Sequence, residues 1–272
     1  MSAPETHVIN PFTRANSVYA KVRPAYPDSA IDYLCQNVKQ LQVTEHEASQ
    51  ETQENTSLLR PAPSHTPVAI DLGAGTGKMT DLLCERGFSV HAVEPAKAMR
   101  EQICPHPHVR IHSGSAEKTG LPDQCADLVV AAQAWHWFDE SAAAQEAARL
   151  LKTSGVLAMV FNQMDVSHPW VHRLTRIMRS GDVHRIDRPP HVGQNFTAPH
   201  LHVVNWTDTL TPDQLMALGR TRSSWLKQNE QGRQRMQENL RWYIHDHLGY
   251  SAHDPVTLPY MTLVWVAQKI TE

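Results

Sequence analysis

Short apolar runs, separated by stretches with helical spacing, dominate the middle of the chain. Residues 68–72 and 88–93 are apolar or β-branched with little polar alternation, which is typical of strands buried on both faces of a parallel sheet. Between these runs, residues 79–86 are predicted to be helical, and Gly87 marks a natural end for that helix. The order strand, helix, strand predicts a βαβ unit.

The same alternation continues to about residue 161 and then becomes less regular. We expect a short helix at 96–103 and an alanine-rich helix at 141–151, each leading into a strand. In chain order the predicted strands are residues 68–72, 88–93, 109–112, 127–132, 155–161, 201–206 and 261–267. This order predicts an α/β fold with a doubly wound, mostly parallel sheet of seven strands. The last connection is long enough for the final strand to return antiparallel beside the fifth.

The chain around this pattern divides into further segments. Residues 1–41 contain a cluster of aromatic and basic residues and then a helix with apolar residues at helical spacing. Residues 42–66 are polar and lack apolar periodicity, which predicts an exposed loop inserted before the core at 67–162. Residues 163–272 are expected to add a cap, inserted between the fifth and sixth strands, and the last strands of the same domain. The helices predicted there cover residues 169–180, 211–225 and 228–247.

Composition narrows the class of protein. The formal net charge is −3 and the pI is about 6.6, so there is no electrostatic case for binding nucleic acid or a membrane surface. No apolar stretch approaches the roughly 20 residues that span a bilayer. The first residues lack the apolar core of a signal peptide, which favours the cytoplasm. The 17 histidines form no metal-binding motif, so we expect no metal site.

A glycine-rich turn follows the first predicted strand. Gly73, Gly75 and Gly77 remove three side chains where the backbone turns sharply and a ligand can come close. Glu94 ends the next strand, about 20 residues later, where nucleotide-binding βαβ units place a ribose-binding carboxylate. The strand, turn, helix, strand and acid therefore predict a ligand that contains a nucleoside.

The spacing of the turn separates several nucleotide-binding classes. A phosphate-binding P-loop has four residues between its first glycine and the Gly-Lys pair, and Ser or Thr follows the lysine. In this turn fewer residues separate Gly73 from Gly77-Lys78, and Met79 follows the lysine. A dinucleotide fingerprint is G-x-G-x-x-G, whereas the turn here is the more compact G-x-G-x-G. No tyrosine is followed by lysine at the Tyr-x-x-x-Lys spacing of short-chain oxidoreductases. The compact turn suits a ligand without a pyrophosphate.

With these motifs the sequence resembles the class I S-adenosylmethionine-dependent methyltransferases. The matching segments are residues 71–77 (DLGAGTG), 91–95 (HAVEP), 114–122 (GSAEKTGLP), 126–131 (ADLVVA) and 150–155 (LLKTSG). Residues 19–27 (YAKVRPAYP) and 132–139 (AQAWHWFD) resemble a small-molecule branch related to trans-aconitate methyltransferases. The resemblance implies a Rossmann-like methyltransferase fold with an N-terminal helical lid at 1–41.

The resemblance also implies S-adenosyl-L-methionine as the cofactor. The glycines would approach its methionine part and its ribose, and Glu94 would accept hydrogen bonds from both ribose hydroxyls. Many relatives carry an acid where this chain has Ser115, so the adenine partner stays open among three consecutive residues. The full predicted cofactor set is Tyr19, Arg23, Asp71, Gly73, Ala74, Gly75, Gly77, Glu94, Pro95, Ser115, Ala116, Glu117 and Gln133.

Five of these residues have alternative interpretations. Glu94 would otherwise be a solvated strand end, and Glu117 an exposed loop charge. Asp71 would hold either the ammonium group of the cofactor or the glycine turn itself. In the lid, Arg23 would pair with the methionine carboxylate and Tyr19 would lie against the sulfonium. The alternative is a surface arm whose aromatic residues only pack on the core.

The acceptor site is predicted where the fourth strand ends, because open α/β sheets bind ligands at this edge. The predicted substrate-binding residues are Trp135, His136, Trp137, Arg220 and Arg222. His136 is the candidate general base for an acceptor that must lose a proton. An inward-facing Arg222 would favour an anionic acceptor such as a carboxylate, and the alternative is an exposed basic helix end.

We therefore predict a methyltransferase that acts on an oxygen or nitrogen of a small molecule, either a monomer or a homodimer. Two alternatives from other classes stay open. One is a nucleotide-dependent oxidoreductase, and the other is a non-catalytic protein that binds S-adenosylmethionine.

Overall fold

A computed structural model of the chain describes residues 22–50, 66–180 and 184–270. Tyr19 and the remainder of the predicted lid before residue 22 lie outside the described residues, as do residues 51–65. No helix in the described ranges is long and apolar enough to cross a membrane. Within the same ranges, no three or more His, Cys, Asp or Glu side chains are grouped so that they could hold a metal ion.

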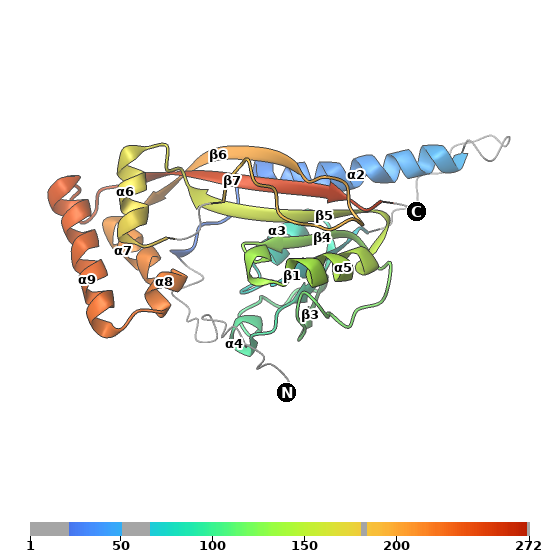
Figure 1. The fold of residues 1–272 in the computed structure, drawn as a ribbon, viewed down its shortest axis with the longest axis horizontal. Helices are drawn as coiled ribbons and strands as arrows, with labels where there is room; N and C mark the ends of the chain where they lie inside the picture. Colours follow the sequence, from blue (N-terminus) through green and yellow to red (C-terminus); the bar gives the residue numbers. More distant parts are fainter. Residues whose placement is uncertain (1–21, 51–65, 181–183, 271–272) are drawn as a thin grey trace, which may run out of the picture.

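A seven-stranded sheet in the order β3-β2-β1-β4-β5-β7-β6 forms the centre of the molecule (Figure 1). Its strands are β1 (Val68–Leu72), β2 (Ser89–Val93), β3 (Val109–His112), β4 (Ala126–Ala132), β5 (Leu151–Met164), β6 (His200–Leu210) and β7 (Val256–Gln268). Every pair from β3 to β5 is parallel, and β7 runs antiparallel to both of its neighbours. The predicted mostly parallel sheet is confirmed, and so is the antiparallel return of the final strand beside the fifth.

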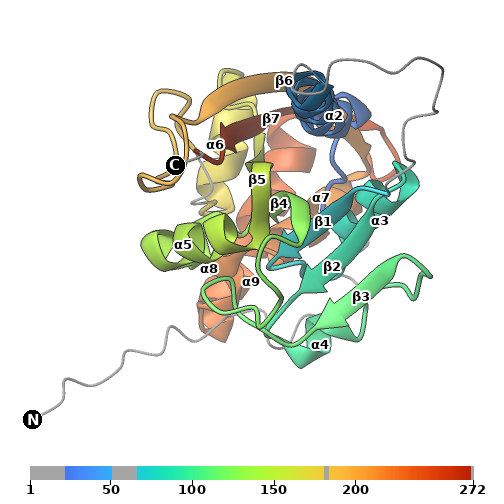
Figure 2. The ribbon, with the colours of Figure 1, turned by 90° about the vertical axis from the view of Figure 1, so that its right-hand side faces the viewer.

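Helices cover both faces of the sheet (Figure 2). On one face lie α2 (Asp28–Gln50) and α3 (Lys78–Glu85), and on the other lies α5 (Glu140–Leu150). The two apolar cores alternate along the strands, because Val129 packs on the α5 face and Val130 on the face of α2 and α3. Burial on both faces explains why these strands are almost continuously apolar.

The first helix is longer than predicted. The exposed loop was expected to begin at residue 42, but α2 continues to Gln50, so this boundary was wrong. The segment from 42 onward lacks an apolar stripe, which favoured a loop. Its Gln, Glu and Ala residues nevertheless have good helix propensity, and the helix continues through them.

The cap is also built differently from the prediction. Its elements are α6 (Pro169–Ile177), α7 (Pro212–Arg220), α8 (Ser223–Leu226), α9 (Glu230–Arg241) and the π-helical turn η3 (Trp242–His247). Among the described helices of the cap, α6 alone lies between β5 and β6, whereas the others lie between β6 and β7, so a cap inserted wholly between the fifth and sixth strands was wrong. The ribbon of β5, β7 and β6 extends beyond the parallel strands, and the cap helices pack at its end (Figure 1).

Two short elements complete the fold near the carboxyl edge of the parallel strands. The helix expected at 96–103 is reduced to α4 (Lys97–Arg100), and the 3-10 turn η2 (Trp135–Trp137) follows β4. The single helix expected over 211–225 is broken into α7 and α8, with Arg222 in an extended conformation between them. This break matters for the site described next.

Candidate active site

The glycine turn lies between the ends of β1 and β2. Gly73 donates its N–H to the carbonyl of Val93 at 2.8 Å, which ties the turn to the neighbouring strand. All three glycines have positive φ, but their surroundings differ. A Cβ at Gly73 would lie 2.8 Å from the Cβ of Ala134, and one at Gly77 would crowd an isoleucine side chain at 3.1 Å. At Gly75 the nearest atom would be a carbonyl oxygen at 4.0 Å, so this glycine faces open space.

Glu94 lies directly beside that space. Its carboxylate accepts hydrogen bonds from the N–H of Gly75 at 3.0 Å and from the N–H of Ala96 at 2.8 Å. Burial raises the pKa of Glu94, and these two backbone donors oppose the rise. A carboxylate has about four acceptor positions, so Glu94 can still accept hydrogen bonds from ligand hydroxyls.

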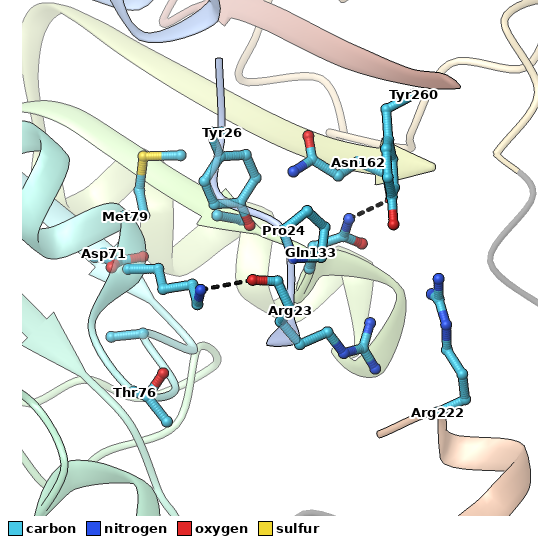
Figure 3. A pocket seen from close by; sticks show the side chains of 13 residues that line it. Arg23, Pro24, Tyr26, Asp71, Thr76, Met79, Gln133, Asn162, Arg222 and Tyr260 are labelled. Carbon is cyan, nitrogen blue, oxygen red and sulfur yellow. Dashed lines mark hydrogen bonds between the residues drawn. The ribbon is translucent and has the colours of Figure 1, made fainter. Parts of the chain in front are cut away.

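A cavity of about 100 Å³ extends from the glycine turn toward the cap (Figure 3). Asp71, Thr76 and other residues of the β1–α3 region line one end. Arg222 and Tyr260 line the other end, which belongs to the antiparallel part of the fold. The cavity therefore joins the two halves of the sheet.

Asp71 is fully buried at the first end. One carboxylate oxygen accepts a hydrogen bond from the hydroxyl of Thr80 at 2.7 Å, and the other has no partner among the described residues. Burial raises the pKa of Asp71 to about 7, and the negative charge of Glu94 adds to the rise. The carboxyl group can thus receive a further hydrogen bond or a positive charge.

The chain before α2 lines this cavity with Arg23, Pro24 and Tyr26, and its role as a lid stays a prediction. The guanidinium of Arg23 donates to the carbonyl of Thr221 at 2.8 Å. The backbone carbonyl of Arg23 accepts a hydrogen bond from the ammonium of Lys78 at 2.7 Å. Asn162 of β5 donates its side-chain amide to the carbonyl of Ala25 at 2.8 Å. Three elements far apart in the sequence therefore hold this segment, which we call the strap (residues 22–27).

Arg222 and Tyr260 face each other across the far end of the cavity (Figure 3). Arg222 is 4% exposed and Tyr260 is 1% exposed. The Tyr260 hydroxyl has no hydrogen-bond partner among the described residues, and burial raises its pKa to about 12. The hydroxyl is therefore protonated at neutral pH and can donate a hydrogen bond into the cavity.

Gln133 contacts the cavity where β4 ends. Its φ is 58°, an uncommon conformation for a residue with a side chain, and its N–H donates to the carbonyl of Val160 at 2.8 Å. Its side-chain amide donates to the carbonyl of Asn162. Gln133 was predicted from sequence, whereas Lys78, Asn162 and Tyr260 were not.

Sequence reasoning missed Tyr260 because the final strand was expected to start only at the next residue. One signal was available. An antiparallel strand begins at the edge where its parallel neighbours end, so the first residues of the final strand were candidates for the site.

Several other predicted residues lie outside this cavity. Trp135 and His136 line a second cavity, described below, and Trp137 is 38% exposed with the Lys227 ammonium 5.8 Å above its ring. Arg220 is exposed and donates to Gln237. The role of His136 as a general base stays a prediction.

The predicted adenine residues form a short turn beside η2. Ser115 and Lys118 are bridged through their backbones, and Ala116 is buried. Glu117 accepts a hydrogen bond from the N–H of Asp139 at 3.1 Å, so one of its oxygens already has a partner. Pro95 is exposed beside Glu94. The assignment of these residues to adenine stays a prediction.

Comparison with known proteins identifies the family. A methyltransferase domain model matches residues 70–159. An uncharacterized methyltransferase of Mycobacterium tuberculosis is 34% identical over 254 residues, which cover 93% of each chain. The chain belongs to the methyltransferase family. An uncharacterized methyltransferase-like protein of Schizosaccharomyces pombe is 27% identical over 75% of this methyltransferase and 83% of its own length.

Solved structures share the fold of this methyltransferase. A proposed type II methyltransferase from Anaeromyxobacter dehalogenans has a TM-score of 0.57 and 22% identity, over 91% of this chain and 97% of its own. A proposed methyltransferase from an antibiotic biosynthesis pathway of Anabaena variabilis has a TM-score of 0.51 and 21% identity, over 72% of this chain and 90% of its own. Family and fold together confirm the predicted class I superfamily. The trans-aconitate branch stays a prediction.

Proposed function

We propose that this methyltransferase uses S-adenosyl-L-methionine to methylate a small carboxylate. One observation carries the proposal: a single cavity joins the Asp71 end of the glycine turn to Arg222 and Tyr260. The first end has the chemistry of a cofactor site and the second has the chemistry of an anion site.

The residues at the first end and beside it fit the cofactor. Gly75 and Glu94 do not line the cavity itself, but Gly75, between the lining residues Ala74 and Thr76, leaves space beside the backbone, and Glu94 has acceptor positions for two ribose hydroxyls. The unpartnered oxygen of Asp71 suits the ammonium of the methionine part, and the guanidinium of Arg23 suits its carboxylate. When bound, S-adenosylmethionine supplies a methyl group on a positively charged sulfur that leaves as a neutral thioether.

The second end fits an acceptor carboxylate. The guanidinium of Arg222 carries a permanent charge and can pair with two carboxylate oxygens, and the protonated Tyr260 hydroxyl can donate a further hydrogen bond. Both groups are buried, so solvent screens the interaction little.

An acceptor of this class needs little chemistry from the protein. A carboxylate is already deprotonated at neutral pH, so no general base is required. The contribution of the chain is to place the acceptor oxygen in line and to keep water out. The strap closes over the cavity through Arg23 and Lys78, which supports this role.

The proposal is tested by following transfer of a labelled methyl group to a panel of carboxylic acids and their matched primary amides. We expect products only from the acids, and these products should release methanol in base, as methyl esters do. The Arg222→Gln variant should raise the KM for the acid more than tenfold, whereas Arg241→Gln, an exposed arginine on α9, should not.

Other results would contradict the proposal. Base-stable products would indicate transfer to nitrogen or to an ether oxygen. Cofactor binding by calorimetry without methylation of any acceptor would favour a non-catalytic binding protein. Binding of a nicotinamide dinucleotide in place of S-adenosylmethionine would contradict the cofactor assignment.

A further inference from the structure

A second cavity, of about 460 Å³, lies on the opposite face of the sheet from the first. Phe161 of β5 lines the second cavity, and the next residue, Asn162, lines the first. Successive residues of a strand point to opposite faces, so the sheet itself separates the two cavities. The second is bounded by η2, the start of α5, β7 and the loop that leads into β6.

The walls of the second cavity combine flat aromatic and proline rings with charged and imidazole side chains. The rings of Phe161 and His184 stack with centroids 3.9 Å apart and planes 24° apart. Trp265 of β7 and the pair Pro189 and Pro190 face the same space. Aromatic and proline surfaces of this kind pack well against a flat ring.

A buried donor contributes to the wall at η2. Trp135 is 0% exposed, and its indole N–H has no hydrogen-bond partner among the described residues. An indole N–H can only donate, and a buried donor without an acceptor costs roughly 1–3 kcal/mol. A ligand oxygen would remove this cost.

The charged groups that line the cavity are mainly positive. Arg185 and Arg188 line it, against Glu140 as the one acid among the lining residues described. Arg185 forms an ion pair with Asp187, whereas Arg188 makes none with any residue in the described ranges. Arg188 is therefore the charge that can pair with an anion.

The loop over the cavity is held at both ends, so the walls are formed in advance. The backbone N–H of His184 donates to the side-chain oxygen of Gln163 at 2.6 Å. The side-chain amide of Gln163 donates in return to the backbone carbonyl of His184 at 3.1 Å. At the other end, Thr197 donates its N–H to the carbonyl of Gln268 at 2.9 Å. Phe196 is buried in the core between these two points. A preformed site loses less conformational entropy when a ligand binds.

We propose that this second cavity is a binding site for a small flat aromatic carboxylate, separate from the site of methyl transfer. The ring lies between the Phe161–His184 stack and Trp265, the carboxylate pairs with Arg188, and an oxygen on the ring accepts the Trp135 N–H. This site goes beyond the proposed methyltransferase activity, because none of its lining residues lines the first cavity.

The test uses 6-hydroxy-2-naphthoate as the probe and 2-naphthol as its neutral counterpart. Each is titrated calorimetrically into the full chain, with and without saturating S-adenosylhomocysteine. We expect saturable one-to-one binding of the carboxylate in both conditions, at least tenfold tighter than binding of 2-naphthol.

The affinities of variants show in which of the two cavities the probe binds. Arg188→Gln should weaken probe binding about tenfold, and Arg235→Gln, an exposed arginine on α9, should leave it unchanged. Trp135→Phe keeps an aromatic ring, removes the N–H and should also weaken binding, with circular dichroism as the check of its fold. Arg222→Gln should have no effect.

Three results would overturn the proposal. They are equal affinity for the carboxylate and the neutral probe, binding that Arg188→Gln does not change, and binding that Arg222→Gln or S-adenosylhomocysteine abolishes. The last result would place the probe in the first cavity. Failure of the methyl-transfer assay leaves these titrations interpretable, because none of them measures turnover.

Discussion

Asp71 and Tyr260 face the same cavity, and each has a buried polar atom without a partner among the described residues. Such an atom destabilises the folded state by about 1–3 kcal/mol. Neither residue is needed for packing alone, since an apolar or amide side chain of similar size would avoid the cost. Their presence at the two ends of one cavity is what a ligand site requires.

Tyr260→Phe should separate binding from stability. The hydroxyl makes no described hydrogen bond, so its loss should leave the free energy of unfolding unchanged or raise it. The acceptor KM should rise about fivefold to tenfold, as expected for one lost hydrogen bond, with cofactor affinity unchanged. Tyr243→Phe is the matched control, because that hydroxyl donates to the carbonyl of Trp170 at 2.8 Å. The control should lose about 1 kcal/mol of stability and keep its KM; the reverse pattern would contradict the role of Tyr260.

Asp71 should make stability depend on pH. Burial raises its pKa to about 7 in the folded state, from about 3.9 in an unfolded chain. Its contribution to stability is therefore complete below about pH 4 and is lost as the pH rises through about 7.

Asp71→Asn should remove this dependence. In denaturant unfolding at pH 5 and pH 8, the difference between the two pH values should be smaller in the variant, and the variant should be the more stable protein at pH 8. Its affinity for S-adenosylmethionine should fall, because the ammonium loses a charged partner. A variant that is less stable than the native chain at pH 8 would show that the Asp71 carboxylate stabilises the fold.

At the scale of elements, the strap is the segment proposed to close the first cavity. Its carbonyl groups accept hydrogen bonds from Lys78 of α3 and Asn162 of β5. Its Arg23 guanidinium donates to the carbonyl of Thr221, which follows α7. Since these elements come from different parts of the fold, the strap is positioned only when all three are packed.

Lys78→Met should loosen the strap. Burial lowers the pKa of Lys78, and its ammonium donates to the carbonyl of Arg23, so the variant loses a charge-assisted hydrogen bond. Amide hydrogen exchange in residues 22–27 should become faster by about fivefold or more, and cofactor affinity should fall. Lys97→Met, an exposed lysine on α4, serves as the control. Unchanged exchange in Lys78→Met would show that the other two contacts suffice.

The sequence predicted the elements of the parallel half closely, because each βαβ unit has its own local signals. The glycines of the turn and the apolar run of β4 set their own boundaries within a residue or two. The antiparallel half carries no such signals. The lengths of β5, β6 and β7 depend on their pairing with one another. Pairing between segments that are distant along the chain produces no local hydrophobic pattern in the sequence.

The same distinction explains the site. Gly75 and Glu94 were predicted because their spacing follows from one βαβ unit. Tyr260 was missed because it meets Arg222 only through tertiary packing. The break between α7 and α8 follows Gly219, but this glycine is itself helical and was taken as part of one continuous helix. Trp135 and Arg222, predicted as parts of one site, lie in different cavities because the sheet separates them.

At the scale of the whole molecule, the first cavity draws on segments from the strap to the final strand. Long-range pairing holds them together, with β7 between β5 and β6 at the centre of the antiparallel ribbon. A ligand in this cavity contacts both halves of the sheet, so binding should stabilise them as one unit.

Ligand-linked unfolding tests this unity. S-adenosylhomocysteine at one hundred times its Kd should raise the free energy of unfolding by about 2.7 kcal/mol in a single transition. Glu94→Gln, which should weaken the proposed ribose contacts, is the control and should show a smaller rise at the same concentration. Two transitions, of which only one moves with ligand, would show that the cap unfolds independently of the parallel core.

The antiparallel return of β7 has a consequence for the order in which the enzyme is made. Asp71, the glycine turn and Glu94 leave the ribosome early, whereas Tyr260 is translated long afterwards. At about 5–20 residues per second, the interval is on the order of ten seconds or more. The proposed cofactor end of the cavity is therefore synthesised first and the proposed acceptor end last. A nascent chain cannot hold an acceptor until β7 has been translated and has inserted between β5 and β6.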